Sequence, residues 1–534
     1  MTVTTASELR KRQDEILLPN EEGWKEEIIT VSPDEVRGLQ EPEEFLFLYR
    51  DVQKVMADMI SDPQLFGRLV LRGREKWVKI NTPVGGQDII KEVRIYDEPH
   101  HCDAFLTAQE AVLKLSPQPL HSVVAAMQLY SDKTVITFRG HSLHPVRFTL
   151  LNIPGSFRGD YLQHVAYFPE FPTGTKNEVK LVALSKCLEL LFAPVKPAVA
   201  EGVELQAPSG SKYLFFPRLL SYVADDPEWR DLLAIYNHSS SVPCDKCTVS
   251  PSDLGLNVQT EPTVSYRCGL QTKHIQEKAV SALKDPTRTA QSVLDYCTDR
   301  GVKSVLSGLF SLTPPSPADG SYTAGAFSRD GDIHLAAGYD TLHNDDLGWV
   351  KDFISAVCEY IKDARNSHTR IFKKMNDFLA KCERTDDFPL PSNGYFPKMP
   401  HAQALEHRNV LQLLPLIFNA IISDLPSTQE ATVILDLICR VVDTYMDCHR
   451  RNKPPFYSGE DLVALQEKIT VTNDLTVKLL GRYLPSISGA PGATIKRHRH
   501  VNHFVPTVRW LGHPKHYSSQ KFEASHVHVK RAWK

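Results

Sequence analysis

The sequence has no long apolar segment. Its most apolar stretch, Asn409–Ile422, is shorter than the roughly 20 residues that cross a bilayer, and it contains Asn, Gln and Pro. The N-terminal residues contain no apolar core of the kind found in signal peptides. We therefore expect no membrane partner and no secretory leader, and we place the protein in a reducing compartment, the cytosol or nucleus.

Cysteine and net charge are also low. The 534 residues include ten cysteines, of which only Cys244 and Cys247 form a close pair. A secreted disulfide scaffold would be shorter and richer in cysteine. Lys and Arg number 61 and Asp and Glu 64, giving a net charge of −3. This balance excludes histone-like binding through bulk positive charge but leaves room for a local basic patch.

Short apolar runs predict strands between residues 120 and 275. The first three are separated by turn signals and suggest a meander, whereas the fourth contains Pro217, which counts against an unbroken central strand. Apolar residues at helical spacing predict helices at 44–59 and 178–191, and mostly helical structure beyond residue 275. The four predicted strands are 123–130, 135–139, 146–152 and 213–223.

Together these patterns predict an α/β protein with a mixed sheet and a large all-α region. Residues 496–534 carry nine Lys or Arg, seven His and one acidic residue, which suggests an anionic partner near the C-terminus. We divide the chain into a flexible N-terminal tail (1–44), an α+β subdomain (45–119), a mixed-sheet core with the Cys pair (120–275), a helical region (276–490) and a basic C-terminal segment (491–534).

Two aspartates follow predicted strands. Asp132 comes directly after the first strand, and Asp225 comes after the run that ends at Val223. Carboxylates held at the ends of neighbouring strands can share two divalent ions, and their hard oxygen ligands favour Mg²⁺. Such a pair of ions activates a water or hydroxyl group against a phosphodiester. The alternative is that both are ordinary loop residues.

Cys244 and Cys247 form a CxxC motif that could supply two thiolates to Zn²⁺. Their nearest candidate co-ligands in the sequence are His238, Cys268 and His274. The alternative is two free thiols in a turn. A redox function is disfavoured because no thioredoxin-like helix start follows the motif.

Two further groups have both a functional and a structural interpretation. Asp340 and His343 precede a predicted amphipathic helix and could cap it or brace a phosphate. A histidine-rich stretch near the C-terminus could bind metal or phosphate, or form a solvated basic surface. Its histidines are His498, His500, His503, His513 and His516.

Several motifs occur in an order that resembles one protein family. The block LYSDKTVITFRGHSLHPVRFTLLNIPGSFR around Asp132, with RIYDEPHHCDAFLTAQ before it, is similar to fungal DDE transposases of the Plavaka kind. These are related to the group that contains Kyakuja, Dileera, Zisupton and CACTA elements. ADDPEW around Asp225, the CxxC motif, YDTLHNDDLGW around Asp340 and FEASHVHVKRAW around Glu523 follow in the order of that family.

The resemblance implies an RNase H-like core interrupted by an all-α insertion. Asp132, Asp225 and Glu523 would form a catalytic triad that binds Mg²⁺ or Mn²⁺, with Asp340 and His343 facing it from the insertion. The implied reaction is metal-dependent DNA strand cleavage and transfer in the nucleus. Basic residues near the triad would contact phosphates without reading the base sequence. They are Lys133, Arg139, Lys530 and Arg531.

The resemblance also implies action as a multimer, although the chain contains no heptad repeat of a dimeric coiled coil. The first 44 residues contain no Cys or His, so we predict no zinc finger there. That feature motivates a second hypothesis, a non-catalytic nuclear DNA-binding or scaffold protein derived from a transposase. No Gly-rich nucleotide loop, G-x-S-x-G elbow or H-E-x-x-H helix supports an unrelated enzyme.

Overall fold

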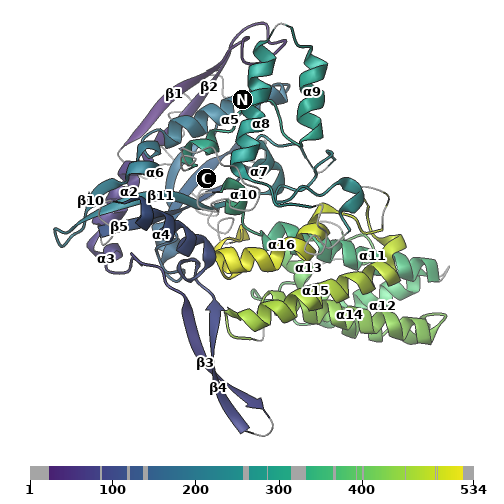
Figure 1. The fold of residues 1–534 in the computed structure, drawn as a ribbon. Coiled ribbons are helices and arrows are strands. Elements are labelled where there is room, and N and C mark those ends of the chain that lie inside the picture. The colour runs from purple at the N-terminus through teal and green to yellow at the C-terminus, as the bar shows by residue number, and fades with distance from the viewer. Residues whose placement is uncertain are drawn as a thin grey trace.

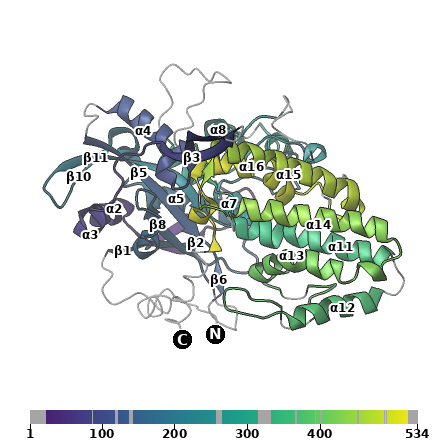
Figure 2. The ribbon, with the colours of Figure 1, turned by 90° about the horizontal axis from the view of Figure 1, so that it is seen from below.

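A seven-stranded mixed sheet and a bundle of helices lie side by side in the computed structural model of the chain (Figures 1 and 2). The structure describes residues 23–84, 87–116, 121–135, 142–237, 239–255, 264–285, 287–313, 332–364, 368–391, 394–399, 402–450, 453–486, 489 and 491–520.

The large sheet has the strand order β1-β2-β9-β8-β5-β11-β10. One neighbouring pair, β5 and β11, is parallel, and the other neighbouring pairs are antiparallel. The mixed α/β class predicted from the sequence is therefore confirmed. The strands are β1 (Trp24–Val31), β2 (Glu43–Arg50), β5 (Ser122–Ser131), β8 (Pro145–Leu150), β9 (Gln163–Tyr167), β10 (Val203–Gln206) and β11 (Lys212–Val223).

Two smaller sheets accompany it. Strands β3 (Lys76–Val84) and β4 (Gln87–Tyr96) form a long antiparallel arm that projects from the body of the molecule (Figure 1), and β12 (Tyr457–Ser458) pairs with β4. Strands β6 (Thr134–Val135) and β7 (Ser142–Leu143) pair with each other.

Helices cover both faces of the sheet and form the separate bundle. Those around the sheet are α2 (Val52–Ser61), α3 (Pro63–Phe66), α4 (Asp103–Leu115), α5 (Asn177–Phe192), α6 (Lys196–Glu201), α7 (Asp226–Leu232), α8 (Gly269–Lys284), α9 (Ala290–Asp299), α10 (Ile333–Ala336) and α16 (Ile495–Leu511). Those of the bundle are α11 (Val350–Ala364), α12 (His368–Lys381), α13 (Ala404–Asn419), α14 (Thr428–Cys448) and α15 (Gly459–Leu480), preceded by the π-helical segment η6 (Leu342–Trp349).

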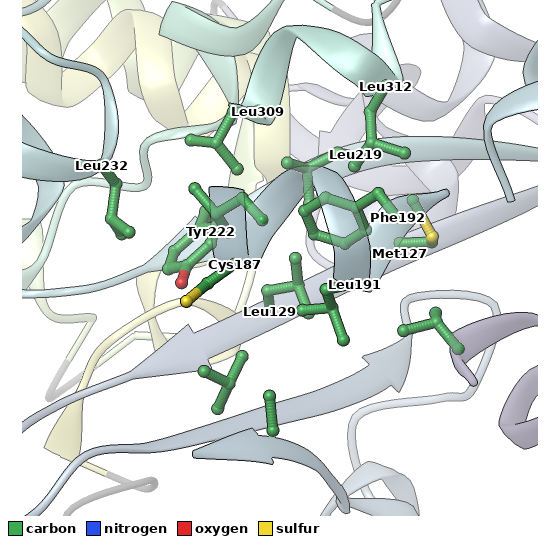
Figure 3. Close-up of a cluster of buried hydrophobic side chains, with 14 of the residues drawn as sticks. Met127, Leu129, Cys187, Leu191, Phe192, Leu219, Tyr222, Leu232, Leu309 and Leu312 are labelled. Atoms are coloured by element: carbon green, nitrogen blue, oxygen red, sulfur yellow. The ribbon is translucent and has the colours of Figure 1, made fainter. Parts of the chain in front are cut away.

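The central strands are buried on both faces, which explains their nearly continuous apolar sequences. Along β5, Met127 and Leu129 face the hydrophobic cluster shown in Figure 3, together with Leu191 of α5. The alternate residues, including Ala126 and Tyr130, face a second cluster with α4 and α16. Because alternate side chains of a strand point to opposite faces, β5 contributes residues to two hydrophobic clusters.

Pro217 does not interrupt β11. The strand runs through it, and Pro217 pairs in parallel register with Ala125 of β5. On the other side, β10 pairs only with residues 212–215 of β11. The missing backbone donor of proline is tolerated because the neighbouring strand on that side ends before it.

The N-terminal tail predicted for residues 1–44 is corrected by the structure within its described part. Residues 24–31 form edge strand β1, and Ile29 and Val31 are buried in the core. The outward-facing residues of this edge strand are charged, which explains why its sequence pattern predicted a flexible tail. The helix predicted for 44–59 is also partly wrong: 43–50 is a strand, and α2 begins only after Asp51, whose carboxylate caps it.

The boundary predicted at residue 276 differs from the packing. Helices α8 and α9 place Ala279, Val293 and Cys297 in the same hydrophobic cluster as the sheet. The bundle has its own cluster, which extends from Trp349 to Leu484. No helix in the described ranges is both long enough and apolar enough to span a membrane.

Four buried histidines remain neutral in the fold. Burial lowers the pKa of His334 to about 3 and that of His407 to about 4. Burial likewise lowers the pKa of His100 and His513 to about 3. Each imidazole therefore resists protonation that it would accept in the unfolded chain.

We expect mild acid to destabilise the fold for this reason. Below the ordinary histidine pKa of about 6.5, the unfolded chain binds protons that the folded chain does not, so stability is lost as the pH falls through that value. At pH 5.5 each histidine would contribute a loss of about 1.4 kcal/mol. His144, whose pKa is raised, acts in the opposite direction. Urea unfolding at pH 7.5 and 5.5 tests this: His407→Gln should reduce the difference between the midpoints, and equal midpoints in the wild type would contradict the prediction.

Candidate active site

The two aspartates predicted to bind metal follow the adjacent parallel strands β5 and β11. Tyr130 of β5 pairs with Val223 of β11, and Asp132 and Asp225 each lie two residues beyond this pair. Because parallel strands run in the same direction, their carboxyl ends meet at one edge of the sheet. Both aspartates therefore leave the sheet at that edge.

A further carboxylate, Glu228, links the two strand ends. The hydroxyl of Ser131, the residue before Asp132, donates a hydrogen bond to it, and His144 Nε2 lies 2.9 Å from Glu228 Oε1. Although burial opposes protonation of His144, the charges of Glu228 and Asp132 raise its pKa above the usual value. Sequence reasoning missed Glu228 and His144; the available signal was a third acidic residue three positions after Asp225.

Asp225 is held in place by α7. It is the N-cap residue, and its carboxylate accepts a 2.8 Å hydrogen bond from the backbone N–H of Glu228. Burial, together with the negative charge of Glu228, raises the pKa of Asp225, while His343 acts in the opposite direction. A fixed carboxylate whose charge is disfavoured by its surroundings is a group that a cation would stabilise.

Asp340 lies two residues before η6, and His343 in the first turn of η6 contacts it. His343 Nδ1 is 2.5 Å from Asp340 Oδ2. Asp340 also accepts hydrogen bonds from the backbone N–H of Ser519, at 3.1 Å, and from its hydroxyl, at 3.0 Å. This pair therefore binds a segment close to the end of the described chain.

A cavity of about 430 Å³ brings several of these groups together. Asp225, Asp340 and His343 are among its lining residues, and α16 contributes Lys496 and Arg499. The cavity is thus lined by carboxylates at the sheet edge and by cationic side chains from a helix far along the sequence. Such a lining can accommodate both a cation and an anionic ligand.

Other predicted site residues that the structure describes, including Asp132, do not line this cavity. Lys133 is exposed beside Asp132. Glu523, Arg139, Lys530 and Arg531 lie outside the described residues, so the triad and the phosphate contacts stay predictions.

The Cys pair lies in a separate buried group. Cys244 and Cys247 are joined there by His498 and His503 of α16, and all four potential ligand atoms lie within 4.8 Å of one another. The group does not include Cys268 or His274, and His238 lies outside the described residues.

The histidine-rich stretch is not a solvated basic surface within α16. Arg497, His498, Arg499 and His500 are all buried there. Their side chains form hydrogen bonds or ion pairs with residues of the CxxC loop, η6 and the bundle. A run of basic residues looks solvent-facing in sequence, and only the three-dimensional positions of those partners explain its burial.

A buried ionic network in η6 also escaped prediction. Asp345 is fully buried, and its carboxylate accepts a 2.7 Å hydrogen bond from the indole of Trp349 and lies 3.1 Å from His449, the residue after α14. The neighbouring Asp346 forms an ion pair with Arg408 of α13. These contacts connect the segment after Asp340 to the bundle.

Comparison with known proteins gives one family. The model of the Plavaka transposase family matches residues 4–308, more than half of the 534 residues. The matched region contains β5, β11, both strand-end aspartates and the CxxC motif. No curated protein matches the sequence. The match confirms the family resemblance of the motifs up to residue 308, and it shows that the chain belongs to the Plavaka transposase family.

Proposed function

We propose that the protein is a DDE transposase that cleaves and joins DNA strands with Mg²⁺ or Mn²⁺. The observation that carries this proposal is that Asp132 and Asp225 follow the carboxyl ends of two neighbouring parallel strands, β5 and β11. Family membership implies a transposase-like function, DNA binding and the use of divalent metal in general. The specific chemistry rests on the two aspartates.

The fold proposed for the catalytic part is an RNase H-like core. Strands β5, β8 and β9 are successive antiparallel neighbours, and β11 lies parallel to β5. This mixed arrangement supports the proposal because it places the two aspartates on adjacent strands. The all-α insertion would correspond to the bundle between Trp349 and Leu484, which has its own core.

The residues at the sheet edge suit a hard divalent cation. Carboxylate oxygens are the ligands that Mg²⁺ prefers, and the pKa of Asp225 is raised by burial and by the charge of Glu228, so a cation would relieve its unfavourable environment. When bound, such ions supply an activated water and neutralise charge on the leaving oxygen. Asp132 and Asp225 would hold them, with Glu523 completing the site.

The remaining residues would position DNA. Asp340 and His343 would line the approach to the reacting phosphate, and Lys496 and Arg499 would add positive charge to the cavity wall. Lys133, Arg139, Lys530 and Arg531 would contact the phosphate backbone. The protein would act in the nucleus as a homo-oligomer on transposon ends and target DNA.

The proposal is tested by incubating the full chain with DNA that carries the ends of its element and with Mg²⁺ or Mn²⁺. Strand cleavage or transfer is expected from the wild type and not from Asp132→Asn. Equal cleavage by the wild type and Asp132→Asn would rule out a catalytic role for Asp132. Salt-sensitive DNA binding without any cleavage would favour the non-catalytic DNA-binding alternative.

A further inference from the structure

The four side chains of the Cys/His group converge from two distant parts of the chain. Cys247 Sγ is 3.2 Å from His498 Nε2, Cys244 Sγ is 3.4 Å from His503 Nε2, and the two Nε2 atoms are 3.3 Å apart. All four residues are buried, and both cysteines are free thiols.

These separations fit a small tetrahedral site. Zn²⁺ binds imidazole nitrogen at about 2.0–2.1 Å and thiolate sulfur at about 2.3 Å, which places tetrahedral ligand atoms roughly 3.3–3.8 Å apart. The three measured separations fall in or just below that range. Two sulfurs and two nitrogens also form a donor set that selects zinc over the hard cations expected at the sheet edge.

Surrounding groups hold these ligands in orientation. The backbone N–H of Lys246 lies 3.3 Å from Cys244 Sγ and donates to it, as the short CxxC loop requires. On α16, His498 Nδ1 is 3.2 Å from the carbonyl oxygen of Leu254. A carbonyl only accepts, so a proton on Nδ1 satisfies this contact and would leave Nε2 available to a metal; the side-chain nitrogen of Asn502 lies at the same distance, 3.2 Å, from Nδ1.

We propose that Cys244, Cys247, His498 and His503 bind a structural Zn²⁺ ion. The ion clamps α16 to the loop that follows α7. All four positions are filled by protein ligands, which is typical of a structural site and leaves no open position for a substrate.

The clamp also positions the wall of the cavity. Arg499 follows the ligand His498 and donates two hydrogen bonds, of 3.0 and 2.7 Å, to Asp245 inside the CxxC loop. It also forms an ion pair with Asp226, the residue after Asp225. A metal ion that fixes His498 therefore also fixes α16, which holds Arg499 next to Asp226. The importance of this Arg499 position for catalysis rests on the proposed function, whereas the zinc site itself does not.

The test is metal analysis of the purified full chain, without DNA or added Mg²⁺. One zinc per chain is expected in the wild type, and replacement by Co²⁺ should give the intense visible absorption of a tetrahedral thiolate site. Cys247→Ser and His503→Gln should reduce the zinc content at least tenfold. The matched controls Cys439→Ser and His274→Gln change exposed residues outside the group and should retain the metal.

Because loss of a metal ligand can prevent folding, the wild type provides an independent measurement. Removal of zinc with 1,10-phenanthroline, in the presence of excess Mg²⁺, should lower the thermal midpoint, and added Zn²⁺ should restore it. A folded wild-type protein that contains no zinc and gives no Co²⁺ spectrum would overturn the proposal. Zinc binding together with absent DNA cleavage would support the clamp while rejecting the transposase chemistry.

Discussion

Asp225→Asn is expected to lower the rate of metal-dependent strand cleavage about a thousandfold or more. Asparagine is nearly isosteric and caps helices as well as aspartate does, so α7 should keep its start. What is lost is the negative charge that holds a divalent cation, and metal ions contribute several kcal/mol to transition-state stabilisation. The measurement is the single-turnover cleavage rate over a range of Mg²⁺ concentrations, with folding checked by circular dichroism.

Asp231→Asn is the matched control on the same helix. Asp231 is partly exposed and forms a 2.8 Å ion pair with Lys303, an interaction type worth about 1 kcal/mol or less. Its substitution should leave the cleavage rate within about twofold of wild type. If Asp225→Asn is as active as this control while Asp225→Ala destabilises the protein, then Asp225 serves only as a helix cap.

Arg499→Met is expected to weaken the attachment of α16 by about 3–5 kcal/mol. The guanidinium group is buried, and its removal takes the main cationic partner from Asp245 and one ion pair from Asp226, which keeps its contact with Arg230. Most of that energy is the cost of leaving the carboxylate of Asp245 buried without the cation that now pairs with it. Hydrogen–deuterium exchange of peptides from α16 should accelerate on the order of 10²–10⁴-fold.

Arg509→Met provides the control because Arg509 is exposed on the same helix. Its effect should stay within about 0.5 kcal/mol. Adding Asp245→Asn to Arg499→Met should recover part of the lost protection, since it removes the uncompensated charge. Unchanged exchange in Arg499→Met would show that this ion pair does not anchor the helix.

The centre of the sheet was predictable because its residues carry an unambiguous pattern. The apolar runs that became β5, β8 and β11 were identified, and so were the aspartates that follow β5 and β11. Helix 178–191 was also close to α5. In each case local hydrophobicity and flanking turn residues agree with the tertiary structure.

Other elements depend on partners that local patterns do not show. The segment 44–59 has helical spacing, yet Phe45, Phe47 and Tyr49 form the buried face of β2, because β1 and β9 lie on either side. Glu228 could not be assigned without knowing that α7 returns to Ser131 and His144.

The Cys/His group illustrates the same limit at long range. The CxxC motif and the later histidines were each noted as candidate metal ligands, but they are about 250 residues apart. His498 and His503 have a spacing within the range of zinc ligands, three to five intervening residues, which was the available signal. Several histidines competed for the role, and only the position of His498 and His503 beside the Cys pair in the folded chain distinguishes these two.

The dependence of the sheet on α16 has a consequence for biosynthesis. Ribosomes add about 5–20 residues per second, so the half-site at Cys247 would wait roughly 10–50 s for His498 to emerge. During that interval the face of β5 and β11 that α16 later covers is exposed, and slower elongation lengthens the exposure. A chain that ends before residue 495 would lack α16 and leave this face uncovered, so we expect it to be less soluble than the full chain when both are expressed.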